Sequence, residues 1–171
     1  MAIGLWPTGG DTGAPFLLAE ETVMFKRLTV VLLAALALSA CDGVDPNSPL
    51  GQRKAIFKDM LKTSEDLGGM LRGRLPFNGD TFAEGAVKLD ALSHQPWQHF
   101  PAVADSGDSS ARAAVWERQA RFQDLARQLE GVTGELVQAA QVKPLDPAQL
   151  KTPMDNVEAA CKACHTEFRN H

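Results

Sequence analysis

Two thiols and an imidazole lie close together near the end of the 171-residue chain, in Cys161-Lys162-Ala163-Cys164-His165. On a helix, Cys161 and Cys164 are about one turn apart, so both sulfurs project to the same side. That spacing suits two thioether bonds to the vinyl groups on one edge of a haem, and His165 follows where its imidazole can reach the iron. The C-x-x-C-H pattern is the attachment sequence of c-type haem. It predicts one covalent haem c.

Three other interpretations of this motif exist. A thioredoxin-like C-x-x-C would lie at a helix N-terminus after a strand, whereas this one lies deep in the last expected helix. A disulfide between residues one helical turn apart has poor geometry. A zinc site in a haem-free lipoprotein needs four ligands, and the motif supplies three. The fourth could come from one of three other histidines, namely His94, His99 and His171.

The spacing of apolar residues predicts four amphipathic helices to position the motif. They cover about 51–72, from 80 to 95, from near 110 to 142, and from 146 or 153 to 170. No strand pattern of comparable length competes with them. Tyrosine is absent and aromatic residues make up 6% of the chain, which disfavours a β-sandwich core. The fold class is therefore predicted as all-α, an antiparallel four-helix bundle.

Helix ends are predicted from capping residues. Thr81 with Glu84 three residues later fits a capping box for the second helix. Asp146 followed by Pro147 is a start signal for the last helix, although Pro153 leaves open a start at that residue. In the third helix, Gly131 and Gly134 weaken the final turns.

Residues 1–40 are interpreted as an upstream extension followed by a lipoprotein signal peptide. Lys26-Arg27 precede an apolar run over 28–38 that is too short to span a bilayer, and the chain then reads Leu38-Ser39-Ala40-Cys41. We expect translation to start at Met24, lipid to be attached to Cys41, and 41–50 to tether a domain of residues 51–171. This places the protein in the periplasm, held to the membrane by its lipid. A buried helix ending in Cys41 and an ordinary cleaved signal are the alternatives.

Composition narrows the function further. The net charge is −4, so no basic excess indicates nucleic-acid binding. The sequence contains no nucleophile–base pair, no paired acid constellation and no phosphate-binding loop. Enzymatic activity is therefore not predicted.

The chain resembles the cytochrome c′ family, the class II c-type cytochromes, over roughly residues 50–170. The likeness is carried by three segments, Arg53-Lys54-Ala55-Ile56-Phe57-Lys58, Ala114-Val115-Trp116-Glu117 with Phe122, and Cys161-Lys162-Ala163-Cys164-His165-Thr166-Glu167-Phe168-Arg169. The resemblance implies a four-helix bundle with haem attached near the C-terminus. It also implies homodimers through the first two helices and a redox partner that the sequence does not identify.

The resemblance assigns roles to five residues. Cys161 and Cys164 would form the thioethers, and His165 would be the proximal axial ligand. Arg53 matches the family arginine near the haem propionates, where a guanidinium can pair with a carboxylate. Arg169 matches the arginine beside the proximal histidine. A solvated helix face is the alternative for either arginine.

The distal side of the iron decides between two functions. In this family the distal residue lies four positions after the first-helix arginine, which is Phe57 here. Phenylalanine has no donor atom, so the iron would be five-coordinate and open to small gases such as NO and CO, while O₂ would be held poorly. Met60, three residues on, is the possible distal ligand of a low-spin electron carrier; filling the core is its other role.

Overall fold

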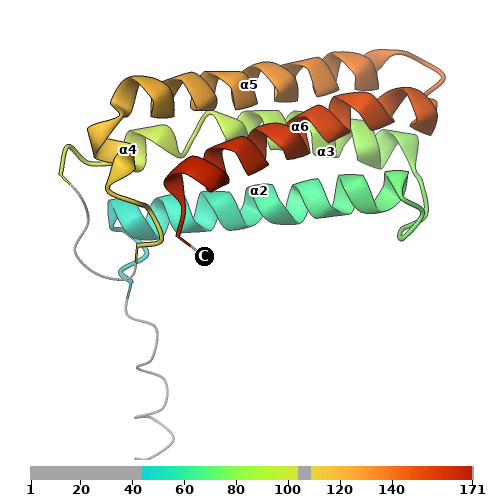
Figure 1. Cartoon of the computed structure of the whole chain (residues 1–171). Helices are drawn as coiled ribbons and strands as arrows, with labels where there is room; N and C mark the ends of the chain where they lie inside the picture. The colour runs from blue at the N-terminus through green and yellow to red at the C-terminus, as the bar shows by residue number, and fades with distance from the viewer. Residues whose placement is uncertain (1–43, 104–108, 171) are drawn as a thin grey trace, which may run out of the picture. The chain divides into compact units, whose positions relative to one another are not determined.

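The computed structural model describes residues 44–103 and 109–170, and these residues form a bundle of four long helices (Figure 1). The long helices are α2 (Pro49–Leu71), α3 (Gly79–Ser93), α5 (Gln119–Gln141) and α6 (Pro147–Phe168). A 3-10 helix, η2 (Trp97–His99), and the short α4 (Ala114–Glu117) lie between α3 and α5. Within these two ranges, β pairing is confined to one bridge between Ala111 and Arg169. The predicted antiparallel all-α bundle is confirmed.

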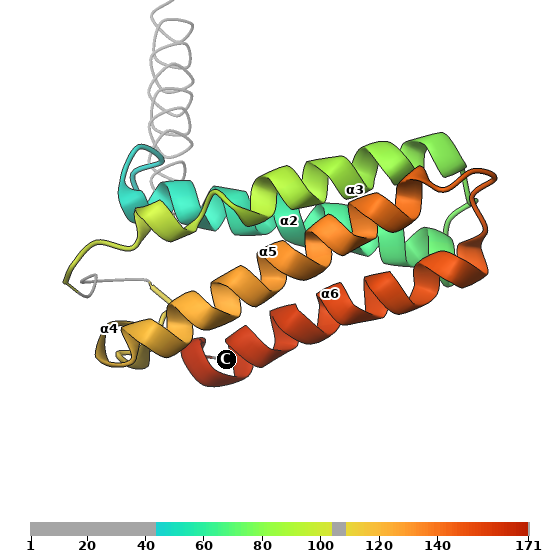
Figure 2. The ribbon, with the colours of Figure 1, turned by 90° about the horizontal axis from the view of Figure 1, so that it is seen from above.

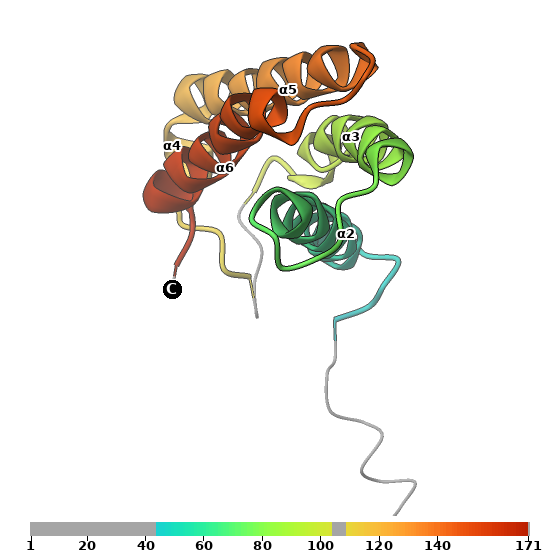
Figure 3. The same ribbon diagram turned by 90° about the vertical axis from the view of Figure 1, so that its right-hand side faces the viewer.

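The four helices are arranged in a ring. α2 packs on α3, α3 on α5, α5 on α6, and α6 returns to α2. Successive helices run in opposite directions (Figure 2), and the end-on view separates the α2–α3 pair from the α5–α6 pair (Figure 3). α4 lies against the C-terminal end of α6. This arrangement brings the start of α2, η2 and the end of α6 to the same end of the bundle.

The first helix begins two residues earlier than predicted. Ser48 is its N-cap, with Oγ accepting a hydrogen bond from the Gly51 N–H at 3.0 Å, and Pro49 takes the first helical position. The compact unit of the chain begins at Val44. Part of the segment 41–50, predicted as a tether, therefore belongs to the folded domain. Cys41 and the predicted signal peptide lie outside the described residues.

The predicted capping box of the second helix is wrong. Asn78 is the N-cap of α3, and its side chain accepts from the Thr81 N–H at 2.9 Å. Thr81 and Glu84 both lie inside the helix. Asn is as good an N-cap as Thr, and a start at Asn78 adds three residues of helix beside α2.

The third predicted helix is two helices. α4 ends and α5 begins around Arg118, whose φ of −122° and ψ of 48° interrupt the helical backbone. Gly131 and Gly134 do not end α5, which continues to Gln141. Packing of the buried face of α5 outweighs the low helix propensity of two glycines.

The last helix begins at the earlier of the two predicted starts. The Asp146 carboxylate accepts from the Ala148 N–H at 2.9 Å, and Pro147 opens the helix. Pro153 lies inside α6, where it removes one backbone hydrogen bond to Gln149. Buried residues on both sides of Pro153, Leu150 and Met154, hold the helix in place. The helix ends at Phe168, two residues before the predicted Asn170.

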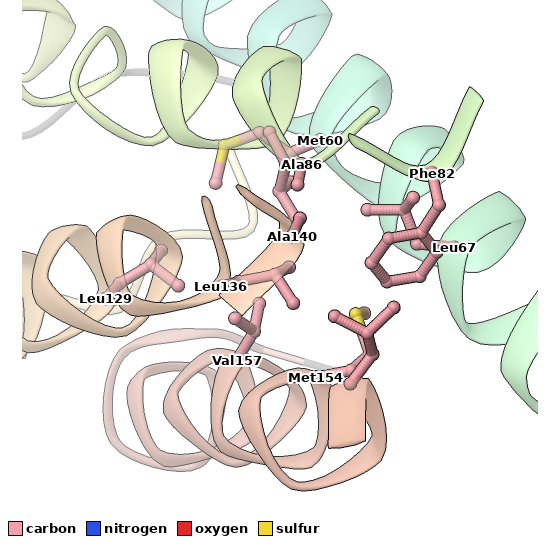
Figure 4. Packing of buried hydrophobic residues seen from close by; sticks show 11 residues of the cluster. Met60, Leu67, Phe82, Ala86, Leu129, Leu136, Ala140, Met154 and Val157 are labelled. Carbon is pink, nitrogen blue, oxygen red and sulfur yellow. The ribbon is translucent and has the colours of Figure 1, made fainter. Parts of the chain in front are cut away.

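Buried side chains form two clusters. The larger contains Met60, Leu67, Phe82, Ala86, Leu89, Leu129, Leu136, Ala140, Leu150, Met154 and Val157 (Figure 4). The smaller lies near the ends of α4 and α6 and contains Val115, Phe122, Leu125 and Phe168. No helix among the described residues combines the length and apolar character needed to cross a membrane.

Candidate functional site

The two thiols of the predicted haem motif lie on the inner side of α6, near the junction of the two buried clusters. Both side chains are half-buried, and neither forms a disulfide. Cys161 packs against the larger cluster, and Cys164 packs against the smaller one. A planar group bonded to both sulfurs would therefore contact both clusters.

The environment of the thiols disfavours redox or nucleophilic cysteine chemistry. Burial raises the pKa of Cys164 to about 11, with smaller contributions from Cys161 and Glu167. Burial also raises the pKa of Cys161, together with the charge of Glu158. A reactive C-x-x-C depends on a lowered pKa, commonly at a helix N-terminus, whereas this motif lies near the C-terminal end of α6.

The zinc alternative lacks a fourth ligand in the described residues. No group of three or more His, Cys, Asp and Glu side chains there is arranged to hold a metal ion. His94 lies beside Asp90 and Glu130, at 3.8 and 3.5 Å, between α3 and α5. The backbone carbonyl of His99 accepts a hydrogen bond from Arg53. His171 is outside the described residues.

His165 lies in the last turn of α6 and is exposed. A set of arginines holds this turn against α4 and α5. Glu167 accepts from Arg121 Nη2 at 2.8 Å and pairs with Arg118 Nη1 at 3.2 Å, and Arg112 Nη1 donates to the Thr166 carbonyl at 3.1 Å. The hydrogen bond from Arg121 lowers the pKa of Glu167.

Sequence reasoning missed this arginine set. Glu167 is part of the quoted motif, yet no role was predicted for it. Its two ion-pair partners are 46 and 49 positions away in the chain, and they come beside it because α5 packs on α6. Arg169 follows directly after the helix, and its backbone N–H donates to the His165 carbonyl at 3.1 Å. The role predicted for the Arg169 guanidinium stays a prediction.

Arg53 is buried, which rules out the solvated helix face considered for it. Its side chain is 3% exposed, and the guanidinium lies over the Phe100 ring at 4.6 Å. Nη1 donates to the His99 carbonyl at 2.9 Å, and Nη2 donates to Ser109 Oγ at 3.1 Å. A buried guanidinium of this kind suits a carboxylate partner better than a neutral one.

Phe57 and Met60 have different surroundings, although both lie on α2. Phe57 is half-buried and meets Trp97 edge-to-face, with ring centroids 6.0 Å apart. Met60 is 6% exposed and is a member of the larger cluster (Figure 4). Trp97 was not singled out in the sequence because it lies in the irregular segment after Pro96, where no helical period marks a buried face.

These residues fit a covalently attached haem. The donor set contains two protonated thiols one turn apart, an exposed imidazole at the next residue and a buried guanidinium. Apolar rings from α2, η2 and α5 pack in or against the same two clusters as the thiols, namely Phe57, Trp97 and Phe122. The indole Nε1 of Trp97 is buried and has no hydrogen-bond partner among the described residues. An all-α bundle with this motif in its last helix defines a c-type haem protein of the class II kind.

Comparisons with known proteins agree. The family model for cytochrome c′ matches residues 48–169. The chain is 32% identical to the cytochrome c′ of Rhodopseudomonas palustris over 152 residues, which are 84% of this chain and 97% of that protein. It also matches the solved structure of cytochrome c′ from Shewanella frigidimarina, with a TM-score of 0.69 and 28% identity, over 76% of this chain and all of that one. A nitric oxide complex of a variant cytochrome c′ from Alcaligenes xylosoxidans shares the fold at 23% identity, with a TM-score of 0.66, over 76% of this chain and 99% of that one.

The chain belongs to the cytochrome c′ family and carries one covalently bound haem c. The haem supplies an iron that can change its oxidation state and bind small molecules. The thiols of Cys161 and Cys164 are the groups available for the thioethers, and His165 is the residue available to the iron on the attachment side.

Proposed function

We propose that this cytochrome c′ binds small uncharged gases, NO and CO, at a five-coordinate haem iron. The observation that carries the proposal is the position of Phe57, half-buried on α2 and packed against Trp97 and the same cluster as Cys161. Its ring has no atom that could ligate iron. It therefore leaves the sixth position to an external ligand that fits an apolar pocket.

The surroundings of Met60 support the same proposal. Met60 is almost completely buried among leucines and alanines of the larger cluster, where its side chain fills core space. Methionine commonly fills such irregular space. A low-spin electron carrier with Met60 as sixth ligand is the alternative, and electron transfer to a redox partner remains compatible with a five-coordinate iron.

The comparisons support gas binding in proteins of this fold. Variants of the Alcaligenes xylosoxidans cytochrome c′ have been solved with nitric oxide and with carbon monoxide. Their identity to this chain is 23%, so they support the fold, and the argument for this chain rests on Phe57.

Optical spectra of the oxidised, reduced and CO-treated holoprotein test the proposal. A five-coordinate iron gives broad high-spin bands that change when CO is added. Phe57→Met should convert this spectrum to a low-spin one and slow CO binding, while Phe57→Leu should keep it high-spin. Sharp low-spin bands in the unmodified protein that are indifferent to CO would overturn the proposal.

We propose further that the protein is exported and held at the membrane through lipid on Cys41. Support comes from the sequence, in which Lys26-Arg27, a short apolar run and Leu38-Ser39-Ala40-Cys41 follow in order. Homodimerisation through α2 and α3 is proposed on the family resemblance. Two exposed apolar side chains on these helices, Leu61 and Val87, are available for such a contact.

A further inference from the structure

Trp97 carries a buried polar group whose partner is missing from the described residues. Its indole Nε1 is buried and makes no hydrogen bond there. The indole of Trp116 shows the usual arrangement, because its Nε1 donates to the Pro101 carbonyl at 2.8 Å. Buried N–H groups in folded proteins are almost always paired, so the Trp97 indole calls for an acceptor outside this set.

Trp97 lies between the same two clusters that the attachment cysteines border. Among the described residues, Trp97 is the one partly buried hydrophobic side chain that packs against both clusters. Its ring meets Phe57 at 6.0 Å and Phe122 at 5.7 Å, both edge-to-face. Cys161 borders the first cluster and Cys164 the second. A haem bonded to both thiols would therefore border the two clusters that Trp97 joins.

A second donor belongs to the same corner of the bundle. Arg53 Nη1 donates to the carbonyl of His99, two residues after Trp97, and its guanidinium lies over the ring of Phe100. The Trp97 indole and the two groups that contact the Arg53 guanidinium therefore come from four consecutive residues, 97–100.

The chemistry of haem limits which atom can accept this hydrogen bond. The four pyrrole nitrogens bind iron, so the acceptors that the haem itself brings are the carboxylate oxygens of its two propionates. A charged acceptor also gives a stronger hydrogen bond than a neutral one. We propose that the indole N–H of Trp97 donates to a haem propionate, beside Arg53. This inference rests on the covalent haem and is independent of whether the iron is five- or six-coordinate.

The test compares Trp97→Phe with Trp116→Phe in the holoprotein. The second variant is the matched control, because the Trp116 indole already has a backbone acceptor. Resonance Raman spectroscopy of the ferrous protein reports the bending mode of the propionates. We expect Trp97→Phe to shift this mode and to raise the propionate pKa by about one unit, read from the pH dependence of the reduction potential. Trp116→Phe should leave both unchanged.

A measurement on the unmodified protein covers the case in which Trp97→Phe fails to fold. Trp97 and Trp116 are the two indoles of residues 41–171, so the ¹⁵N-labelled diamagnetic reduced protein, as its CO complex or with a sixth protein ligand, gives two indole N–H signals, assigned with Trp116→Phe. The Trp97 signal should follow the titration of a propionate, and the Trp116 signal should not. A Trp97 signal that is indifferent to this titration would overturn the proposal.

Spectra of the CO complex distinguish two possible acceptors of the Trp97 hydrogen bond, a propionate and a ligand bound to the iron. If the indole instead faces a bound gas, Trp97→Phe changes the C–O stretching frequency and the CO dissociation rate several-fold and leaves the propionate mode in place. That result would overturn the propionate assignment. A variant that changes neither mode would also overturn it.

Discussion

Replacing Met60 tests whether this residue fills the core or binds iron. Met60 is 6% exposed within the larger cluster, so a core role predicts the cost of its replacement from packing alone. Met60→Leu nearly conserves volume and should reduce the free energy of unfolding by less than about 1.5 kcal/mol. Met60→Ala leaves a cavity and should reduce it by about 2–5 kcal/mol. The optical spectrum should stay high-spin in both variants.

The assay is urea unfolding of the holoprotein, recorded alongside its spectrum and its rate of CO binding. Met154 provides a matched control, because it is 1% exposed and belongs to the same cluster but lies on α6. Met154→Leu should behave as Met60→Leu does. A low-spin protein that Met60→Leu converts to high-spin, with faster CO binding, would show that the iron holds Met60 and refute the reasoning.

Three further substitutions test other features. Thr133→Val should reduce the free energy of unfolding by about 1–3 kcal/mol in thermal or urea melts, because the buried hydroxyl donates to Asp90 Oδ1 at 2.8 Å. Glu167→Gln should destabilise the protein at neutral pH and progressively less in acid. The pKa of Glu167 is lowered by Arg121 in the folded state, so its stabilisation is present above its unfolded pKa and is lost as pH falls through the folded value. Cys41→Ala should move the haem protein from the membrane to the soluble fraction of a cell lysate.

Each of these expectations has a contradicting result. A Thr133→Val protein as stable as the unmodified one, with Thr133→Ser as control, would mean that the hydroxyl contributes nothing measurable. A Glu167→Gln difference that stays constant between neutral pH and the acid transition would argue against the ion pair. A Cys41→Ala protein that still sediments with membranes would argue against lipid on that residue.

The apolar spacing predicted the bundle because packing of one helical face decides most of a helix's stability. The helix ends were harder to predict. Asp146 was identified correctly, since Pro147 after it strengthens the signal. Asn78 and Thr81 are both good caps three residues apart, so the sequence alone could not separate them. The start of α6 before Pro153 depends on tertiary packing, which outweighs one lost backbone hydrogen bond.

The site divides in the same way. The motif at Cys161 is local and was read directly from the chain. Burial of Arg53 depends on Phe100 and the carbonyl of His99, which are distant in sequence. Trp97 lies in a segment without periodicity, so no pattern marked it as packed between two clusters. Such contacts arise from the packing of η2 between helices. The helix and strand propensities of single residues do not predict them.

The location of the thiols in the last helix affects when haem can be attached during folding. α2, α3 and α5 are synthesised before either cysteine, and they already contain most of the larger cluster. Once α6 has docked, both thiols are half-buried and protonated, and are poor substrates for an attachment enzyme. Haem attachment therefore competes in time with the closing of the bundle.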